Sequence, residues 1–237
     1  MPFRPLLHAE WIKIRTLRPL VGTLCAVLPA TAVCTALSAA GSGGGSDPLF
    51  SAFAGVSFGQ VAAVAFGATA VTSEVRGAAL RLTLCAVPDR RRWFAAKATA
   101  IALSVLAVGL VTGLVTLVLG RLLLGTAGPT WPEGLRGALG CGVYLTLMAL
   151  FAAGVAAVLR SGTATLGVLV PLLLIVSFVI GDLSAGISDF LPDRAGQAVL
   201  HSGREGTPGP WAGLAVTGLW TATALLAGVR SLRRRDA

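Results

Sequence analysis

The chain has 237 residues and a mean hydropathy of +0.82. Hydrophobic residues make up 55% of it and charged residues only 12%, whereas soluble domains are about 25% charged. The formal charge of +9 is not arranged as a basic stripe interleaved with aromatic residues, the pattern of nucleic-acid-binding surfaces. The composition therefore excludes an ordinary soluble domain and indicates an all-α integral membrane protein that binds a lipid bilayer and no nucleic acid.

Residues 1–18 predict an amphipathic helix that precedes the first membrane span. Helical spacing puts Leu7, Trp11 and Ile14 on one stripe and turns Glu10 and Lys13 away from it. We expect this helix to lie in the plane of the lipid headgroups with Trp11 as its anchor. The alternative is a plain extension of the first span into the cytosol.

Six apolar runs follow, each long enough to cross a bilayer as a helix. They lie at about 20–40, 49–72, 98–120, 137–159, 163–181 and 210–229, and they form a single domain of residues 1–237. Fifteen of the 19 Lys and Arg residues fall in the segments that this order places on the inner side. Because basic residues stay on the cytoplasmic side, both termini are predicted to be cytoplasmic.

The segment from residue 73 to residue 97 is the only long polar break that is strongly basic. Apolar residues at i, i+4 and i+7 spacing predict a short helix within it, and they are Leu80, Leu84 and Val87. Gly77 is suited to end the preceding helix, and Pro88 to stop the short one. Asp89 is the predicted N-cap of the helix that enters the third span.

Several kinds of chemistry are missing from the sequence. None of the ten carboxylates falls in the middle of a predicted span, which argues against the proton relay of a secondary transporter. Neither Lys13 nor Lys97 follows the glycine pattern of a phosphate-binding loop, so no ATPase motif is present. The four cysteines include no CxxC pair. We therefore expect no catalytic residue, no metal and no cofactor in this chain.

Two places leave alternatives open. Gln60 is the only strongly polar side chain of the second span, and it is suited to a hydrogen bond between helices or to a contact with a substrate. The outer connection from residue 182 to residue 209 is equally compatible with a short helix that dips into the outer leaflet and with a solvated loop.

Two cytoplasmic stretches and one outer stretch resemble ABC-2 type transporter permeases of bacteria. HAEWIKIRTLRP at 8–19 resembles the N-terminal entry of these proteins, and VTSEVRGAALRLTLCAVPDRRRWFAAKA at 71–98 resembles their first cytoplasmic loop. FLPDRAGQAVL at 190–200 is similar to the outer loop before their last span. The pattern of the cytoplasmic loop matches at Glu74, Gly77, Leu82 or Leu84, Pro88 and Arg91, with Ala78 where Thr is common.

The resemblance implies a function and a set of partners. The segment between spans 2 and 3 would be a coupling helix that docks on a separate ATP-binding subunit, and its candidate docking residues are Glu74, Arg76, Gly77, Leu80, Leu84, Pro88 and Arg91. The chain would be half of an exporter in the cytoplasmic membrane of a bacterium, paired with a second copy or a similar permease. The alternatives are a scaffold or resistance factor that transports nothing, a secondary transporter, and arginines that bind only anionic headgroups.

Overall fold

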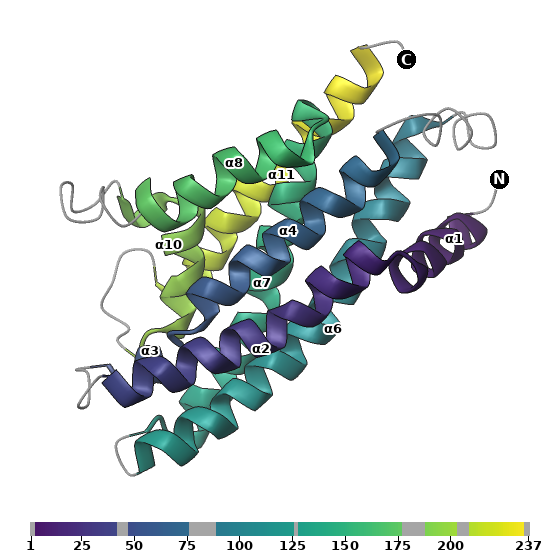
Figure 1. The fold of residues 1–237 in the computed structure, drawn as a ribbon. Helices are drawn as coiled ribbons and strands as arrows, with labels where there is room; N and C mark the ends of the chain where they lie inside the picture. Colours follow the sequence, from purple (N-terminus) through teal and green to yellow (C-terminus); the bar gives the residue numbers. More distant parts are fainter. Residues whose placement is uncertain are drawn as a thin grey trace.

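The computed structural model describes residues 3–41, 47–75, 89–125, 128–176, 188–202 and 209–234. Within these ranges every regular element is a helix and no strand occurs, so the predicted all-helical fold is confirmed there. Figure 1 shows long helices that run side by side in a bundle. Five of them are long and apolar enough to cross a membrane. The chain is therefore a multi-pass membrane protein.

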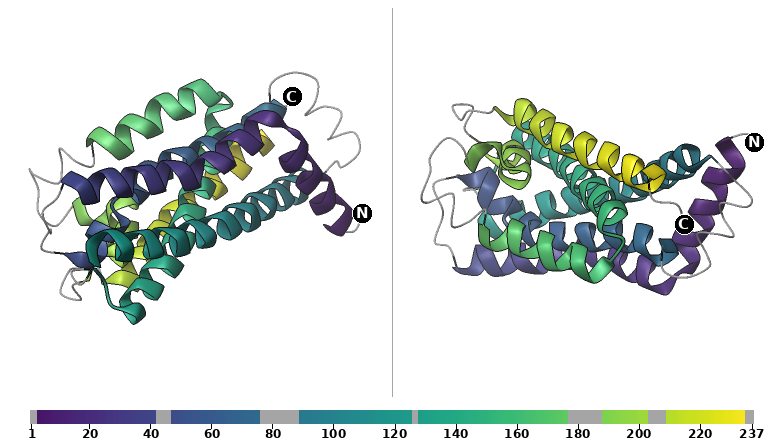
Figure 2. Two further views of the ribbon diagram at one scale, coloured as in Figure 1. Left: turned by 60° about the horizontal axis from the view of Figure 1, so that its bottom comes forward. Right: turned by 90° about the horizontal axis from the view of Figure 1, so that it is seen from above.

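The elements follow one another along the chain as α1 (Phe3–Thr16), α2 (Arg18–Gly41), α3 (Pro48–Phe53), α4 (Val56–Val75), α6 (Arg90–Leu124), α7 (Trp131–Leu159), α8 (Gly162–Pro171), η2 (Leu172–Val176), η3 (Ser188–Phe190), α10 (Pro192–Gln197), η4 (Ala198–Leu200) and α11 (Pro210–Arg234). The five membrane candidates are α2, α4, α6, α7 and α11. Figure 2 shows that α1 does not run along the bundle but crosses it near one end.

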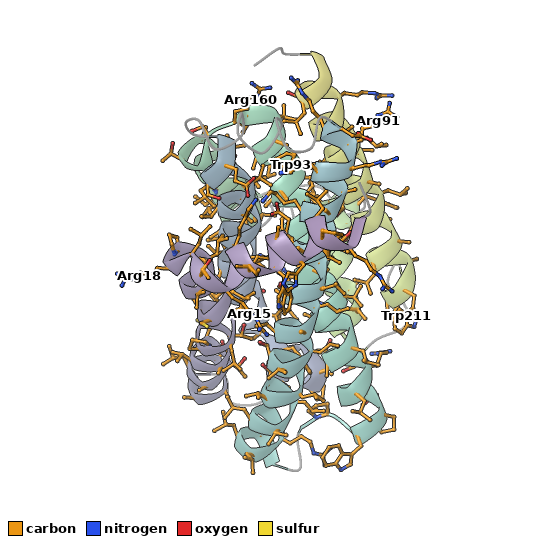
Figure 3. The ribbon with its side chains drawn as sticks, turned by 90° about the vertical axis from the view of Figure 1, so that its right-hand side faces the viewer. Arg15, Arg18, Arg91, Trp93, Arg160 and Trp211 are labelled. Carbon is orange, nitrogen blue, oxygen red and sulfur yellow. The ribbon has the colours of Figure 1, made fainter. Side chains whose placement is uncertain are left out.

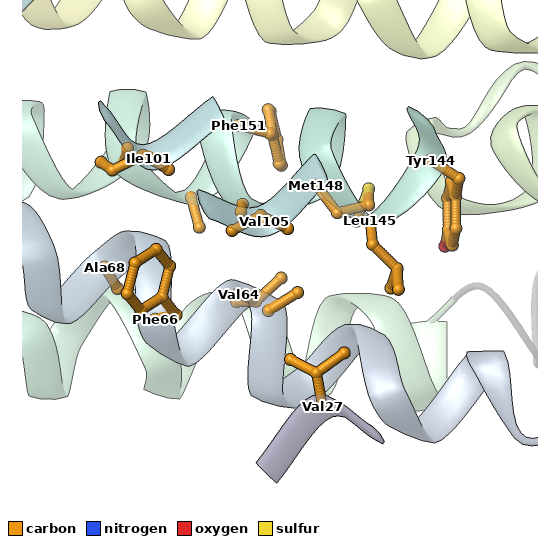
Figure 4. Packing of buried hydrophobic residues seen from close by; sticks show 14 of the residues in the cluster. Val27, Val64, Phe66, Ala68, Ile101, Val105, Tyr144, Leu145, Met148 and Phe151 are labelled. Carbon is orange, nitrogen blue, oxygen red and sulfur yellow. The ribbon is translucent and has the colours of Figure 1, made fainter. Parts of the chain in front are cut away.

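Helix α7 lies at the centre of the bundle and contacts α4, α6 and α11. Its side chains Leu145 and Met148 are buried in one cluster with Val64 of α4 and Val105 of α6 (Figure 4). Small residues let the backbones approach closely: a Cβ atom at Gly67 of α4 would lie only 2.0 Å from a backbone carbonyl oxygen of α7. Tight packing of small residues is typical of helices in a bilayer, where lipid is as apolar as leucine.

The second apolar run is not one helix, which corrects the predicted span 49–72. The chain turns at Ala54 and Gly55, between α3 and α4. At this turn the backbone N–H of Gly55 donates to Thr35 Oγ1 of α2 at 3.3 Å, and a Cβ atom on Gly55 would lie 2.0 Å from a carbonyl oxygen of α2. Only glycine permits this approach, so the turn packs directly against α2.

Helices α6 and α7 both begin earlier than their predicted spans at 98 and 137. The predicted N-cap Asp89 is confirmed, because its side chain accepts hydrogen bonds from the backbone N–H groups of Arg91 and Arg92. At the start of α7, the Glu133 carboxylate accepts from the backbone N–H of Thr130 at 3.2 Å. Such caps satisfy N–H groups that the helix itself leaves free, so the helices extend beyond the apolar core.

The fifth predicted span, 163–181, is described only as far as residue 176. Helix α8 passes at Pro171 into the π-helical turn η2, and this apolar segment is shorter than the five membrane candidates. A proline removes one backbone donor, and the wider turn accommodates it. The fifth predicted span, and with it the total of six, stays a prediction, as does the cytoplasmic location of the termini.

The described part of the outer connection, residues 188–202, forms three short helices that pack on the bundle. Helix α10 contacts α11 and α7, and η4 contacts both as well. Ala195, Val199 and Leu200 are buried against this protein surface. This part of the chain is therefore helical and packed, not a solvated loop, and its depth in the outer leaflet stays a prediction.

Candidate functional site

The predicted docking residues divide into two groups. Glu74 and Arg91 are described, whereas Arg76, Gly77, Leu80, Leu84 and Pro88 lie outside the described residues. Glu74 is buried in the last turn of α4, and Arg91 is exposed in the first turn of α6 (Figure 3). The two ends of the basic segment therefore differ: one carries an exposed positive charge and the other a buried negative one.

Glu74 belongs to a charged cluster of four side chains: Glu10, Lys13, Glu74 and Lys97. Lys97 Nζ lies 2.6 Å from Glu10 Oε2 and 2.7 Å from Glu74 Oε1. Lys13 Nζ lies 2.8 Å from Glu10 Oε1 and 2.9 Å from Glu74 Oε1. Two positive and two negative charges make the cluster formally neutral, as buried charges require.

The charged cluster joins three helices, two of which flank the basic segment along the chain. It ties α1 to the end of α4 and to the second turn of α6, the two helices that flank residues 76–88. The ring of Trp93 adds a cation–π contact, since Lys97 Nζ lies 5.4 Å from its centroid. Glu74 Oε2 and Trp93 Nε1 are buried without a hydrogen-bond partner among the described residues.

The cluster also changes the ionisation of Lys13, which lies outside the membrane candidates. Burial alone would lower the pKa of Lys13, but hydrogen bonds and charge attraction from Glu10 and Glu74 outweigh it and raise the pKa above its ordinary value of 10.5. The lysine is therefore held in its charged form, which keeps the cluster neutral at physiological pH.

The burial of Glu10 corrects the predicted orientation of the N-terminal helix. The helical pattern had Glu10 turned away from the apolar stripe, but only 2% of this residue is exposed, which is less than the 7% of the apolar Ile14. The partner that makes burial possible is Lys97, which lies 87 residues further along the chain. A helical pattern assigns polar residues to solvent and contains no information about such a distant partner.

A second group, the interior polar cluster, lies between α4, α7 and α10 and consists of Ser57, Gln60, Tyr144 and Gln197. The Tyr144 hydroxyl donates to Gln60 Oε1, and Gln197 Nε2 donates to the Tyr144 oxygen at 3.2 Å. Ser57 Oγ donates to Gln197 Oε1 at 3.2 Å. The predicted hydrogen bond from Gln60 across helices is confirmed, and a contact with substrate stays a prediction.

Tyr144 and Gln197 were not identified from the sequence as partners of Gln60. A signal was present, because Tyr144 is the only tyrosine in the chain and stands within an apolar run. A buried tyrosine hydroxyl needs a hydrogen-bond partner, and Gln60 in a neighbouring span is the strongest polar candidate.

A third group, the loop clasp, consists of Asp47, Phe50, Arg136, His201 and Ser202. Asp47 Oδ2 lies 3.0 Å from His201 Nδ1, and Ser202 Oγ donates to Asp47 Oδ1 at 2.6 Å. Arg136 donates to the His201 carbonyl oxygen at 2.7 Å, and Phe50 stacks on the His201 ring with centroids 4.4 Å apart. The clasp fixes the start of α3 to the end of η4 and to the first turns of α7.

Asp47 is ionised more readily than an ordinary aspartate. Its partial burial would raise the pKa, but hydrogen bonds from the Ser202 side chain and from the Phe50 and Ser202 backbone lower the pKa below the ordinary 3.8. The charged form is therefore the one that the clasp stabilises.

Among the described residues no group of three or more His, Cys, Asp or Glu side chains is placed to hold a metal ion. Models of known protein families give no match to this chain, and curated proteins include none that is similar to it. The chain's own residues and geometry are therefore the basis for inferring its function.

Proposed function

We propose that this chain is the membrane-spanning permease subunit of an ATP-binding cassette exporter in the cytoplasmic membrane of a bacterium. The proposal starts from the resemblance of residues 8–19, 71–98 and 190–200 to ABC-2 type permeases. Because the sequence contains no phosphate-binding loop, ATP would be hydrolysed by a separate subunit. A second copy, or a similar permease, would complete the path for the substrate, with six spans in each and both termini in the cytoplasm.

The observation that carries the proposal is the charged cluster. Glu74 lies in the last turn of α4 and Lys97 in the second turn of α6, the two helices that flank residues 76–88 along the chain, and these two side chains form an ion pair with an N···O distance of 2.7 Å. A partner that moved the basic segment would act on α4 and α6 together, and on α1 through Glu10. A subunit driven by an external ATPase needs such a connection between its docking segment and its membrane helices.

A path for the substrate would pass near Gln60, the buried polar side chain of α4. One observation favours the second candidate, a scaffold that transports nothing: all four members of the interior polar cluster are hydrogen-bonded to one another. A scaffold needs no opening there, whereas a permease must break these hydrogen bonds when it transports.

The test compares two variants in membranes of cells that co-express a candidate ATP-binding subunit, to be sought in a neighbouring reading frame. Leu84→Asp would bury a carboxylate in the docking surface, and we expect binding to weaken by on the order of a hundredfold or more. Arg92→Gln is the control, because among the described residues this exposed arginine pairs with Asp89 on the surface, and such pairs contribute about 0–1 kcal/mol. Arg90 is a poorer control, since it donates to the Leu232 carbonyl oxygen.

Co-purification of the ATPase and its hydrolysis in membranes are measured at equal expression of both variants. If Leu84→Asp retains the complex and the hydrolysis at the level of Arg92→Gln, the basic segment is not the docking site. If the unsubstituted protein binds no ATPase at all, the scaffold is the better assignment.

A further inference from the structure

Helix α1 has one buried face and one exposed face, and the exposed face is basic. The buried stripe consists of Leu7, Glu10 and Ile14, which pack toward α6 and the core. Residues on the other side of the helix are exposed, and they are Arg4, Pro5, His8, Ala9, Ile12, Arg15 and Thr16. Arg18, the first residue of α2, is exposed as well and projects away from the bundle in Figure 3.

The position of α1 relative to the membrane is fixed by its connection to α2. Only Leu17 separates the last residue of α1 from the first residue of α2, which is a membrane candidate. Hydrogen bonds continue across this junction, since the Leu17 N–H donates to the Lys13 carbonyl oxygen and the Leu17 carbonyl accepts from Val21. Because α1 crosses the bundle where the apolar span begins (Figure 2), we expect it at the level of the headgroups.

The charged cluster removes the only acidic side chain from the exposed face. Glu10 is the single carboxylate of α1, and its two oxygens are bound by Lys97 and Lys13. Among the described residues no carboxylate pairs with Arg4, Arg15 or Arg18. The exposed face of α1 and Arg18 therefore present three positive charges together, with no compensating carboxylate among the described residues.

Apolar side chains lie among these charges. Ile12 is 47% exposed and Leu17 is 39% exposed, and the Arg15 guanidinium lies 4.9 Å from the centroid of the Trp11 ring. A surface of arginines interspersed with apolar side chains fits the boundary between headgroups and acyl chains, where stems are buried and charged groups remain in water.

We propose that the exposed face of α1, together with Arg18, binds anionic phospholipid headgroups. Guanidinium groups donate paired hydrogen bonds to phosphate oxygens, and each arginine near a negatively charged leaflet strengthens binding. Zwitterionic lipids carry a compensating positive charge and bind this face less tightly. The inference rests on the membrane location of α2 and is independent of the exporter function.

The test uses the full-length protein in detergent and counts bound lipids by native mass spectrometry during titration with phosphatidylglycerol or phosphatidylcholine. The double variant Arg15→Gln/Arg18→Gln should bind phosphatidylglycerol about thirtyfold more weakly than the unsubstituted protein, with phosphatidylcholine binding unchanged. The control, Arg91→Gln/Arg92→Gln, removes two exposed positive charges from the first turn of α6 and should leave phosphatidylglycerol binding near the original level.

The proposal is overturned if the α1 variant binds phosphatidylglycerol as tightly as the unsubstituted protein, or if the α6 control loses as much affinity as the α1 variant. If the α1 variant retains phosphatidylglycerol binding but no longer co-purifies with a soluble acidic partner that the unsubstituted protein binds, the face is assigned to that partner instead. The melting temperature of each variant in phosphatidylcholine alone checks that the variant is folded. Arg4→Gln/Arg15→Gln, which leaves α2 intact, replaces the first variant if that one fails to fold.

Discussion

Lys97 Nζ and Glu74 Oε1 lie 2.7 Å apart although 23 residues separate them along the chain. This ion pair joins the end of α4 to the second turn of α6 and brackets the basic segment between them. Glu10 completes the arrangement from α1, so three elements meet at a single lysine. The stability of the charged cluster therefore depends mainly on Lys97.

Replacing Lys97 with methionine should destabilise the protein by about 3–5 kcal/mol, because two buried carboxylates would lose their shared partner. Arg92→Gln is the matched control and should cost no more than about 1 kcal/mol, since its partner Asp89 lies on the surface. Unfolding in mixed detergent micelles measures both. Equal stability of the two variants would show that the charged cluster contributes little.

The contact of α4 with α7 predicts opposite outcomes for two glycines. Gly67→Ala would place a Cβ atom 2.0 Å from the Ala149 carbonyl oxygen, and we expect a loss of about 1–3 kcal/mol as the helices move apart. Gly22→Ala in α2 meets no atom within 4 Å and should be neutral or slightly stabilising. Melting temperatures in detergent compare them, and a harmless Gly67→Ala would contradict the close approach.

Tyr144→Phe should destabilise the protein by about 1–3 kcal/mol, because it leaves buried Gln60 without its hydrogen-bond donor. Adding Gln60→Leu should restore part of this loss, since neither polar group then stays unpaired. The coupling between the two substitutions is measured by a double-mutant cycle of unfolding free energies. Additive effects would mean that the two side chains do not depend on each other.

The loop clasp predicts a dependence of stability on acid pH. The pKa of Asp47 is lower in the folded state than its ordinary value of 3.8. Its contribution to the free energy of unfolding is therefore fully present above pH 3.8 and is lost as the pH falls through the lower pKa of the folded state. Asp47→Asn keeps a capping side chain but lacks the charge. The melting difference between the two proteins should be full at neutral pH and shrink below pH 3.8. A constant difference would refute the ionic contribution.

The proposed topology predicts different labelling of two introduced cysteines after the four native cysteines have been replaced. Gly209→Cys, which has no atom within 4 Å of its added Cβ, should react with an impermeant reagent in intact cells. Ser231→Cys, near the end of α11, should react only after permeabilisation. Labelling of the cysteine at 231 in intact cells would place the C-terminus outside.

Local signals in the sequence were sufficient to predict the helices but not the contacts between them. Hydropathy predicted the helical membrane protein, and the position of Asp89 directly after Pro88 predicted the start of α6. The break at Gly55 could not be predicted, because the sequence there is apolar on both sides and its hydrogen-bond partner Thr35 lies on another helix. The same reason applies to Glu10, whose buried partner is distant along the chain.

The candidate site was predicted in part. Glu74 was selected through a resemblance, and its burial in an ion network was not anticipated because charges were assigned to a solvated loop. Lys97 was counted only as a positive charge that orients the chain. Buried ion pairs depend on side chains from several elements meeting, which periodicity along a single helix does not encode.

Helix α4 carries a polar residue near each end and a close approach to α7 between them. Gln60 and Glu74 each lie seven residues from Gly67, or about 10 Å along the axis of a rigid helix. The backbone at Gly67 lies against α7, so this contact is a pivot point equally distant from both polar residues. Any tilt of α4 about this point would displace Gln60 and Glu74 in opposite directions by the same distance. A movement at the charged cluster would therefore produce an equally large movement at the interior polar cluster.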